Sequence, residues 1–342
     1  MSPGISHLTA IAAASVGFVL AGTLSPSGEE GAPAVAPAVE IREWTVPWAR
    51  TRPRDPFVDG QGRVWFVGQA GNYIAYLDPA ANRFERFEID SGTHPHNLIV
   101  GRDGAVWYAG NRNGTIGKLD PETGAVTRYA MPPEVRDPHT LIFDDAGDIW
   151  FTAQQSGYVG RLSTRSGKVD ALRVPTPDSR PYGIVVARNG TVWFNEFGVN
   201  KLASIDPTTL AITEYTQPHE RTRGRRLVTT SDGAVWYVDY TRGMLGRFDP
   251  STKRFEEWTN PGGANSMPYA MGVDAKDRIW FVEAGVRPNR LVGFDPETNA
   301  FFSQTEFGPE SNTVRHMYYH APENEFWFGT DAGTIARAKL PD

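Results

Sequence analysis

The sequence predicts an all-β protein, a seven-bladed β-propeller built from four-stranded antiparallel blades and closed by its N-terminal strand. The main observation is a seven-fold repeat of aromatic triplets such as VWF, VWY and IWF, whose tryptophans are spaced 42 to 47 residues apart. Turn dipeptides such as Asp103-Gly104 and Asn189-Gly190 precede the triplets and indicate tight hairpins. A period of about 43 residues is typical of propeller blades. The repeat tryptophans are Trp65, Trp107, Trp150, Trp193, Trp236, Trp280 and Trp327.

The N-terminus reads as a targeting segment. Residues 8–22 form a 15-residue apolar run, shorter than the roughly 20 residues that span a membrane and suited to a signal peptide. No Lys or Arg precedes the run, so a plain apolar tail is the alternative. We predict a signal peptide over 1–22, a flexible Ala/Pro-rich linker over 23–40, and a periplasmic or secreted protein without a membrane span.

Each repeat predicts the same order of strands. The tryptophan strand is followed by a strand such as Ile116–Leu119 and then by an outer strand such as Val126–Tyr129. The last repeat ends without an outer strand, whereas Ile41–Trp44, before the first repeat, has the outer-strand pattern. We therefore predict one propeller over residues 41–342 in which the N-terminal strand completes blade seven. An open stack of sheets is the alternative, and it would leave both end blades unpaired.

Composition excludes several classes of function. The chain carries 34 Lys plus Arg against 40 Asp plus Glu, a net charge of −6, which gives no electrostatic footprint for nucleic acid. It has no cysteine, which excludes disulfides, thiolate zinc sites and a cysteine nucleophile. The sequence does not set the oligomeric state.

Candidate functional residues lie where the repeats differ. The position eleven residues before each tryptophan, here called the ring position, falls at the start of the innermost strand, so seven copies surround one mouth of the central channel. Three of the seven are histidines, far more than random placement of seven histidines in 342 residues gives. The ring residues are predicted to be Arg54, His96, His139, Tyr182, Arg225, Tyr269 and His316.

Strand pairing predicts what faces this ring. With the turn between the fourth and third residues before the tryptophan, the ring residue pairs with the fourth residue after it. This places Asp331 beside His316, where a carboxylate neighbour would suit a general base or metal ligand. The third residue after the tryptophan adds Glu196, Asp239 and Glu283 to the same mouth.

The arginines of the ring allow two interpretations. Arg54 and Arg225 could bind an anionic or carbonyl group of a substrate. Alternatively, Arg225 could pair with Asp239 and Glu196 in a salt-bridged channel lining without function.

The repeats resemble the streptogramin B lyase (virginiamycin B lyase) family of seven-bladed propellers. The resemblance rests on a Pro-(His/Tyr)-x-(Ile/Leu) strand start, seen at 95–98, 138–141 and 181–184, and on a strand with Gly-(Arg/Lys) at 116–119, 159–162 and 245–248. It covers residues 41–342 and is more specific for the fold than for the reaction.

The resemblance implies a chemistry. The family opens a cyclic depsipeptide antibiotic at its ester by elimination, with a histidine base in the last blade and Mg²⁺ held by carboxylates. The base falls on His316 and one metal carboxylate on Asp331. The second metal carboxylate falls on Val314, for which Glu283 is a candidate substitute, and a substrate-contacting histidine falls on Tyr269.

We therefore expect His316 to be catalytic and Asp331 and Glu283 to bind Mg²⁺. The expected substrate-binding residues are Tyr269, His96, His139, Tyr182, Arg54, Arg225, Glu196 and Asp239. The departures at Val314 and Tyr269 favour a small ester, lactone or sugar-derived substrate other than a streptogramin. Two alternatives stay open: a non-catalytic propeller that binds a protein or polysaccharide, and a metal-dependent lactonase or other hydrolase.

Overall fold

The computed structural model describes residues 1, 39–308 and 312–341. The predicted signal peptide (1–22) and nearly all of the predicted linker (23–40) lie outside the described residues, so both stay predictions. Among the described residues, no helix has the length and apolar character needed to cross a membrane.

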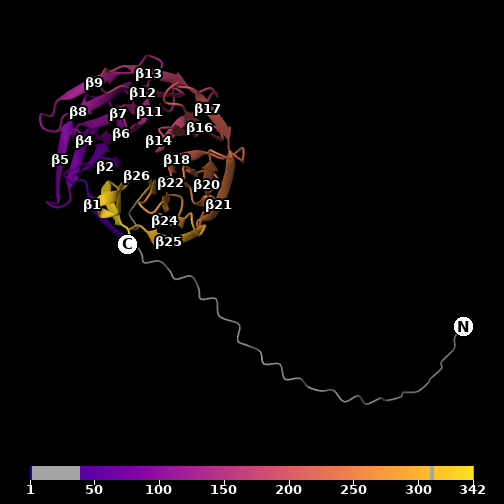
Figure 1. The fold of residues 1–342 in the computed structure, drawn as a ribbon. Coiled ribbons are helices and arrows are strands. Elements are labelled where there is room, and N and C mark those ends of the chain that lie inside the picture. The colour runs from indigo at the N-terminus through magenta and orange to yellow at the C-terminus, as the bar shows by residue number, and fades with distance from the viewer. Residues whose placement is uncertain (2–38, 309–311, 342) are drawn as a thin grey trace. The chain divides into compact units, whose positions relative to one another are not determined.

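The protein forms seven four-stranded antiparallel sheets arranged as blades around a common axis (Figure 1), which confirms the predicted fold class. The innermost strands are β2 (Pro53–Val58), β6 (Pro95–Val100), β10 (Pro138–Phe143), β14 (Pro181–Val186), β18 (Gly224–Thr229), β22 (Pro268–Val273) and β26 (Val314–His320). The second strands, which carry the repeat tryptophans, are β3 (Val64–Gly68), β7 (Val106–Gly110), β11 (Ile149–Ala153), β15 (Val192–Glu196), β19 (Val235–Asp239), β23 (Ile279–Glu283) and β27 (Glu325–Thr330).

The outer half of each blade is equally regular. The third strands are β4 (Tyr73–Asp78), β8 (Thr115–Leu119), β12 (Tyr158–Leu162), β16 (Lys201–Ile205), β20 (Met244–Asp249), β24 (Arg290–Asp295) and β28 (Thr334–Lys339). The outermost strands are β5 (Arg83–Glu88), β9 (Val126–Ala130), β13 (Val169–Arg173), β17 (Ile212–Thr216), β21 (Arg254–Thr259), β25 (Ala300–Glu306) and β1 (Glu40–Thr45). The helices of the described residues are two single 3₁₀ turns, η1 (Gly263–Asn265) and η2 (Ala321–Glu323).

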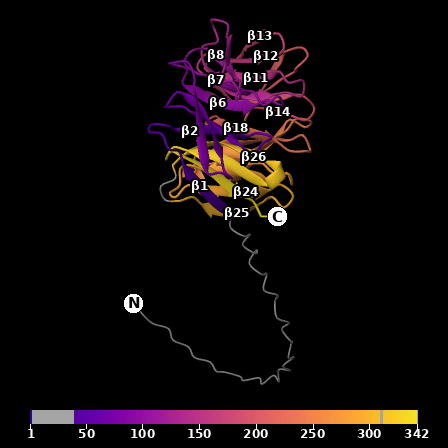
Figure 2. The same cartoon turned by 90° about the vertical axis from the view of Figure 1, so that its left-hand side faces the viewer.

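Blade seven is closed by the N-terminal strand, as the sequence predicts. β1 pairs antiparallel with β28, from Glu40 opposite Lys339 to Thr45 opposite Thr334. In both views the indigo β1 and β2 lie next to the yellow strands of blade seven (Figures 1 and 2). Closure in this way satisfies the edge of the last sheet with strand hydrogen bonds.

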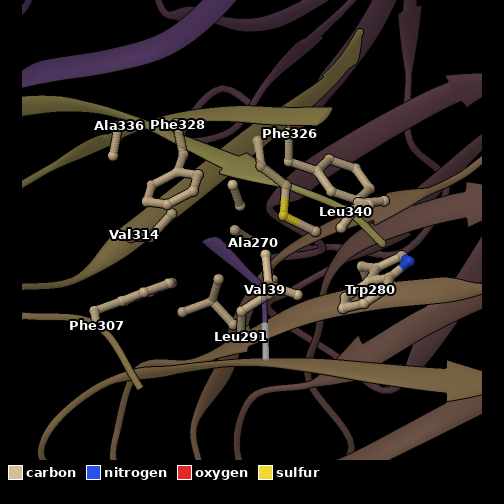
Figure 3. Packing of buried hydrophobic residues seen from close by; sticks show 13 residues of the cluster. Val39, Ala270, Trp280, Leu291, Phe307, Val314, Phe326, Phe328, Ala336 and Leu340 are labelled. Atoms are coloured by element: carbon tan, nitrogen blue, oxygen red, sulfur yellow. The ribbon is translucent and has the colours of Figure 1, made fainter. Parts of the chain in front are cut away.

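The core lies between blades, where the repeat aromatics pack. All seven repeat tryptophans are at most 4% exposed, and several indole N–H groups bind a side-chain oxygen, as Trp65 does with Asp59 at 2.7 Å. Figure 3 shows the cluster between blades six and seven, in which Trp280 and Phe328 pack with Val39, the residue before β1. Burying such large rings accounts for the aromatic triplets of the repeat.

The register between the first and second strands of blades one to six differs from the predicted register by one residue next to the turn, and a bulge shifts it further. In blades one to six the loop has three residues, such as Arg102-Asp103-Gly104, and its last residue has a positive φ, 79° for Gly104. A three-residue loop of this kind shifts the pairing relative to a symmetric tight turn. Each inner strand also carries a bulge, so Pro95 pairs with Gly110 and Leu98 with Tyr108. The predicted opposition of ring residues to the fourth residue after the tryptophan is therefore wrong.

Blade seven has a different inner loop, and its ring residue changes as a result. Its loop comprises four residues, η2 plus Asn324, so Val314 pairs with Thr330 and Met317 with Phe328. Val314 therefore holds the place that a proline holds in five of the other blades and Gly224 in blade five, and Arg315 holds the ring position. His316 is one residue further along the strand than the sequence alignment on tryptophans indicates.

The closing strand generates a stability prediction. The Trp44 side chain is 5% exposed and stacks on Trp327 with ring centroids 5.3 Å apart. We expect Trp44→Ala to lower the free energy of unfolding by about 3–5 kcal/mol, because it leaves a cavity at the closure. Urea denaturation at neutral pH measures this value.

The control is Thr127→Ala on the exposed face of β9, expected to change the free energy of unfolding by less than about 0.5 kcal/mol. Equal, small effects of the two substitutions would contradict a stabilising role of the closure.

Candidate functional site

The ring residues form a packed layer across the mouth, which we define as the channel end where the inner strands begin. Arg54 donates from Nη1 to Nε2 of His96 at 2.9 Å and to Gln69 at 3.3 Å. The imidazole of His96 stacks on that of His139, with centroids 3.6 Å apart, and His139 contacts Tyr182 at 4.5 Å. The mouth therefore consists of side chains in mutual contact around the ring.

Both ring histidines are neutral. A guanidinium can only donate, so His96 must accept through Nε2. Burial and the charge of Arg54 lower the pKa of His96 well below its ordinary value, and burial with Arg226 does the same for His139. These two histidines are predicted substrate-binding residues that the structure holds buried at 6% and 2% exposure.

Two tyrosines and an arginine complete the opposite side of the ring. The hydroxyls of Tyr182 and Tyr269 share a short hydrogen bond, and Arg225 lies over the faces of both rings. Burial alone would raise the pKa of Tyr182, but Arg226, Arg54 and Arg225 hold it below its ordinary value. Burial raises the pKa of Tyr269 to about 12.

Arg226, which the sequence analysis missed, ties the layer below the ring together. It is 3% exposed and reaches across the channel from β18. Its Nη2 lies 3.2 Å from Oδ2 of Asp55, its Nη1 donates to Thr140 at 3.3 Å, and its Nε donates to the carbonyl of Arg315 at 3.1 Å. One side chain of blade five thus contacts blades one, three and seven. The only sequence signal was its place directly after a ring residue.

His316 lies in this lower layer. It is half-buried, and Nδ1 has no hydrogen-bond partner among the described residues. Burial and the nearby Arg226 lower the pKa of His316 to about 4, although Asp55 acts in the opposite direction. Its imidazole is therefore neutral at neutral pH. Its predicted role as a general base stays a prediction.

Asp331 is paired with arginines. It forms ion pairs with Arg315 and, at 3.4 Å, with Nε of Arg52. A narrow cleft at the junction of blades seven and one, with no room for a water molecule, is lined by Arg54, Asp55, Arg315, His316 and Asp331, together with Pro53, Thr313 and Gly329. His316 and Asp331 thus share a cleft, but they are not strand neighbours as predicted.

The three other predicted carboxylates do not face the mouth. Asp239 accepts the backbone N–H groups of Arg223, Thr241 and Arg242 and so fixes its own loops. Glu283 accepts the N–H of Gly262 at 2.7 Å and pairs with Arg290. Glu196 lies under Glu214, and burial raises its pKa to about 8.

The prediction that these groups line the mouth is wrong, because the bulge and the shifted register turn their side chains into the blades. The salt-bridged lining of Arg225, Asp239 and Glu196 does not form either. Arg225 instead lies among aromatic rings.

The residues at the mouth do not fit Mg²⁺. Magnesium in proteins requires oxygen ligands, usually carboxylates. Asp331 already neutralises two guanidiniums, Val314 supplies no oxygen, and Glu283 is bonded elsewhere. The described residues contain no group of three or more His, Cys, Asp or Glu side chains that could hold a metal. The Mg²⁺ prediction stays untested, and the donor set does not support it.

The fold and the mouth define a seven-bladed propeller of the streptogramin-lyase type. A sequence profile of the virginiamycin B lyase family matches residues 83–339, three quarters of the chain, so the protein belongs to this family. No curated protein sequence matches it.

Solved structures show the same fold. A streptogramin B lyase is 24% identical with a TM-score of 0.80, covering 89% of this chain and 98% of its own. A catalytically inactive His-to-Ala virginiamycin B lyase from Staphylococcus aureus with quinupristin is 23% identical with a TM-score of 0.80, covering 89% and 100%. The extracellular domain of a two-component-system protein from B. thetaiotaomicron is 16% identical with a TM-score of 0.69, covering 87% and 42%.

The neutral histidines of the mouth generate a prediction on pH. Below about pH 6.5 the unfolded chain protonates its histidines while His139 in the folded protein does not, so stability falls as the pH falls. His139→Gln removes this penalty. Its free energy of unfolding relative to wild type should rise by up to about 1.4 kcal/mol per pH unit below pH 6.5. Urea titrations at several pH values between 7 and 5 measure the difference.

His219→Gln, in the loop before β18, serves as the matched control outside the mouth. A relative stability of His139→Gln that does not change with pH would show that His139 is not held neutral.

Proposed function

We propose that the protein binds a small molecule at the mouth and acts on it as a streptogramin-lyase-like C–O lyase that needs no Mg²⁺. The observation that carries the proposal is that His316 and the guanidiniums of Arg54 and Arg315 line the same narrow cleft between blades seven and one, where a substrate seated on the mouth would contact them. A base beside fixed positive charge is the arrangement that removal of a proton next to an ester carbonyl requires. Family membership and fold support the reaction class by analogy.

His316 would take the proton. Because its pKa is lowered to about 4, the imidazole is unprotonated throughout the neutral range and free to accept. A base of such low pKa removes a proton slowly, so we expect modest turnover. The electron pair of the broken C–H bond forms the carbon–carbon double bond, the alkoxy group leaves with its own pair, and the proton passes to that group.

The arginines would stabilise the developing negative charge. Nη2 of Arg54 is buried and has no hydrogen-bond partner among the described residues, so it can donate to a carbonyl oxygen as charge builds up there. Arg315 lines the same cleft. Guanidiniums thus take the position in which the sequence analysis expected a metal.

Binding without chemistry is the second candidate, and the packing of the ring favours it. His96, His139 and Tyr182 contact one another and are buried, as residues of a rigid recognition surface would be. In this case the ligand of the mouth would be bound and released unchanged.

Export belongs to the same proposal. The apolar run at residues 8–22 supports a periplasmic or secreted protein. Mass spectrometry of the mature N-terminus after expression of the full chain tests it, since an intact Met1 in the cytoplasmic fraction would contradict export.

The lyase proposal predicts the outcome of one assay. The purified protein is incubated with a streptogramin B and, separately, with simpler esters and lactones, each in the presence of Mg²⁺ or of EDTA. The masses of the products are measured by mass spectrometry. We expect an opened product of unchanged summed mass, formed equally in EDTA and reduced by at least about 100-fold in His316→Ala. His219→Ala is the control.

Other outcomes have defined meanings. A product heavier by one water indicates hydrolysis, and loss of activity in EDTA indicates a metal after all. Intact compounds throughout would contradict the lyase proposal and leave binding as the function.

The lowered pKa of His316 predicts the pH profile. We expect the rate to fall only as the pH approaches about 4 and to stay level from there to neutral pH, because protonation of His316 removes the base. Initial rates between pH 4 and 8 with the best substrate of the assay measure this. An inflection near the ordinary histidine value of about 6.5 would exclude His316, in this environment, as the base.

A further inference from the structure

The mouth holds more positive charge than its carboxylates compensate. Five guanidiniums meet there, those of Arg52, Arg54, Arg225, Arg226 and Arg315. Two carboxylates face them: Asp55, shared by Arg54 and Arg226, and Asp331, shared by Arg52 and Arg315. Only Arg54 and Arg226 are fully buried, and they share the single buried carboxylate of Asp55. Burying charge without a partner is costly, so this buried excess of one cation, beside the partly exposed guanidiniums, points to a missing anion.

The donors of Arg54 indicate where this anion would bind. The side chain is 6% exposed, and neither Nε nor Nη2 has a hydrogen-bond partner among the described residues. Nε lies 3.7 Å from Oδ1 of Asp55, which is too far for a hydrogen bond. An unsatisfied buried donor of this kind is rare in a folded protein and costs about 1–3 kcal/mol.

Arg225 is a second cation without an ion pair, and the aromatic rings around it indicate what the uncharged part of the ligand contacts. Its guanidinium lies 4.1 Å from the ring centroid of Phe197, 4.0 Å from that of Tyr240 and 4.3 Å from that of Tyr269. No carboxylate pairs with it among the described residues, and its Nε is unpaired. Arg225, Phe197 and Tyr240 are half-buried, so solvent reaches part of each side chain on this side of the mouth.

We propose that the mouth binds a small organic carboxylate whose carboxylate group is held by Arg54 and Arg225 and whose ring lies against Phe197 and Tyr240. Planar guanidiniums bind carboxylates through paired N–H···O bonds, and aromatic faces bind the apolar face of a sugar or aromatic ring. The inference rests on the proposed function only in using the same mouth. It narrows the substrate class from esters in general to anionic ones.

The excess positive charge also acts on Tyr182. Three arginines around it stabilise a negative phenolate, which is the direction of its pKa shift. A bound carboxylate would supply the same negative charge from outside.

Direct binding measurements test the proposal without turnover. Calorimetric titrations of the full chain use galacturonate and benzoate, with galactose and benzyl alcohol as the uncharged counterparts and sodium sulfate as an inorganic anion. We expect both carboxylates to bind at least tenfold more tightly than their counterparts and than sulfate. Affinity should fall with added salt, because the attraction is between charges.

Variants locate the binding. Arg225→Gln should weaken carboxylate binding at least tenfold, whereas Arg112→Gln, an exposed arginine on the same side of the propeller, should change it less than twofold. Arg225 has no ion pair to lose, so the variant is expected to fold, and its thermal melting checks this. Arg225→Lys should restore part of the affinity, because it keeps the charge but not the paired donors.

The results separate this inference from the lyase proposal. Equal binding of charged and uncharged compounds, equal effects of Arg225→Gln and Arg112→Gln, or no binding of either carboxylate would each overturn the anion site. Sulfate binding as tight as the carboxylates would overturn the assignment to an organic acid. Carboxylate binding without any turnover would leave the site standing and contradict only the lyase.

Discussion

The pairing of β1 with β28 is the constraint on which the rest of the molecule depends. Seven sheets packed face to face form a ring only if the last blade is complete, and otherwise two hydrogen-bonding edges stay open. The closing strand comes from the other end of the chain, so blade seven is assembled from residues about 300 positions apart. Closure also brings blade one against blade seven, and it is at this junction that Arg52 and Arg54 meet Arg315 and Asp331. The site is therefore a product of ring closure.

Within the closed ring, the length of the loop between the first and second strands of a blade decides which residue enters the site. A three-residue inner loop sets the ring position in six blades, and a four-residue loop moves it by one in blade seven. In a strand a shift of one residue exchanges the two faces. Arg315 consequently pairs with Asp331, while His316 lies beside Arg226 and Asp55. The local chemistry of the last blade thus follows from a single added residue at Ala321–Asn324.

Such features separate what the sequence could predict from what it could not. The tryptophan recurs in all seven units and a turn glycine precedes it in five of them, so errors in one unit are corrected by the others. The seven blades, and the closure of the last one by the N-terminal strand, were predicted for this reason. The prediction that Glu196, Asp239 and Glu283 face the mouth required the strand register to be known to the exact residue. It was wrong, because bulges leave no clear sequence signal. Arg226 went unnoticed because its partner Asp55 is four blades away, and no local pattern links the two.

The electrostatics of the mouth determine which kind of ligand it can bind. The chain as a whole is acidic, with a net charge of −6, yet its mouth gathers five guanidiniums around two carboxylates. A site that holds a divalent cation needs the opposite balance, since carboxylates must outnumber the positive charges beside them. Burial, together with the same positive field, lowers the pKa of His96, His139 and His316 and keeps them neutral. Membership of a family fixes the propeller, but the charges that line its mouth select the ligand, and here they select an anion.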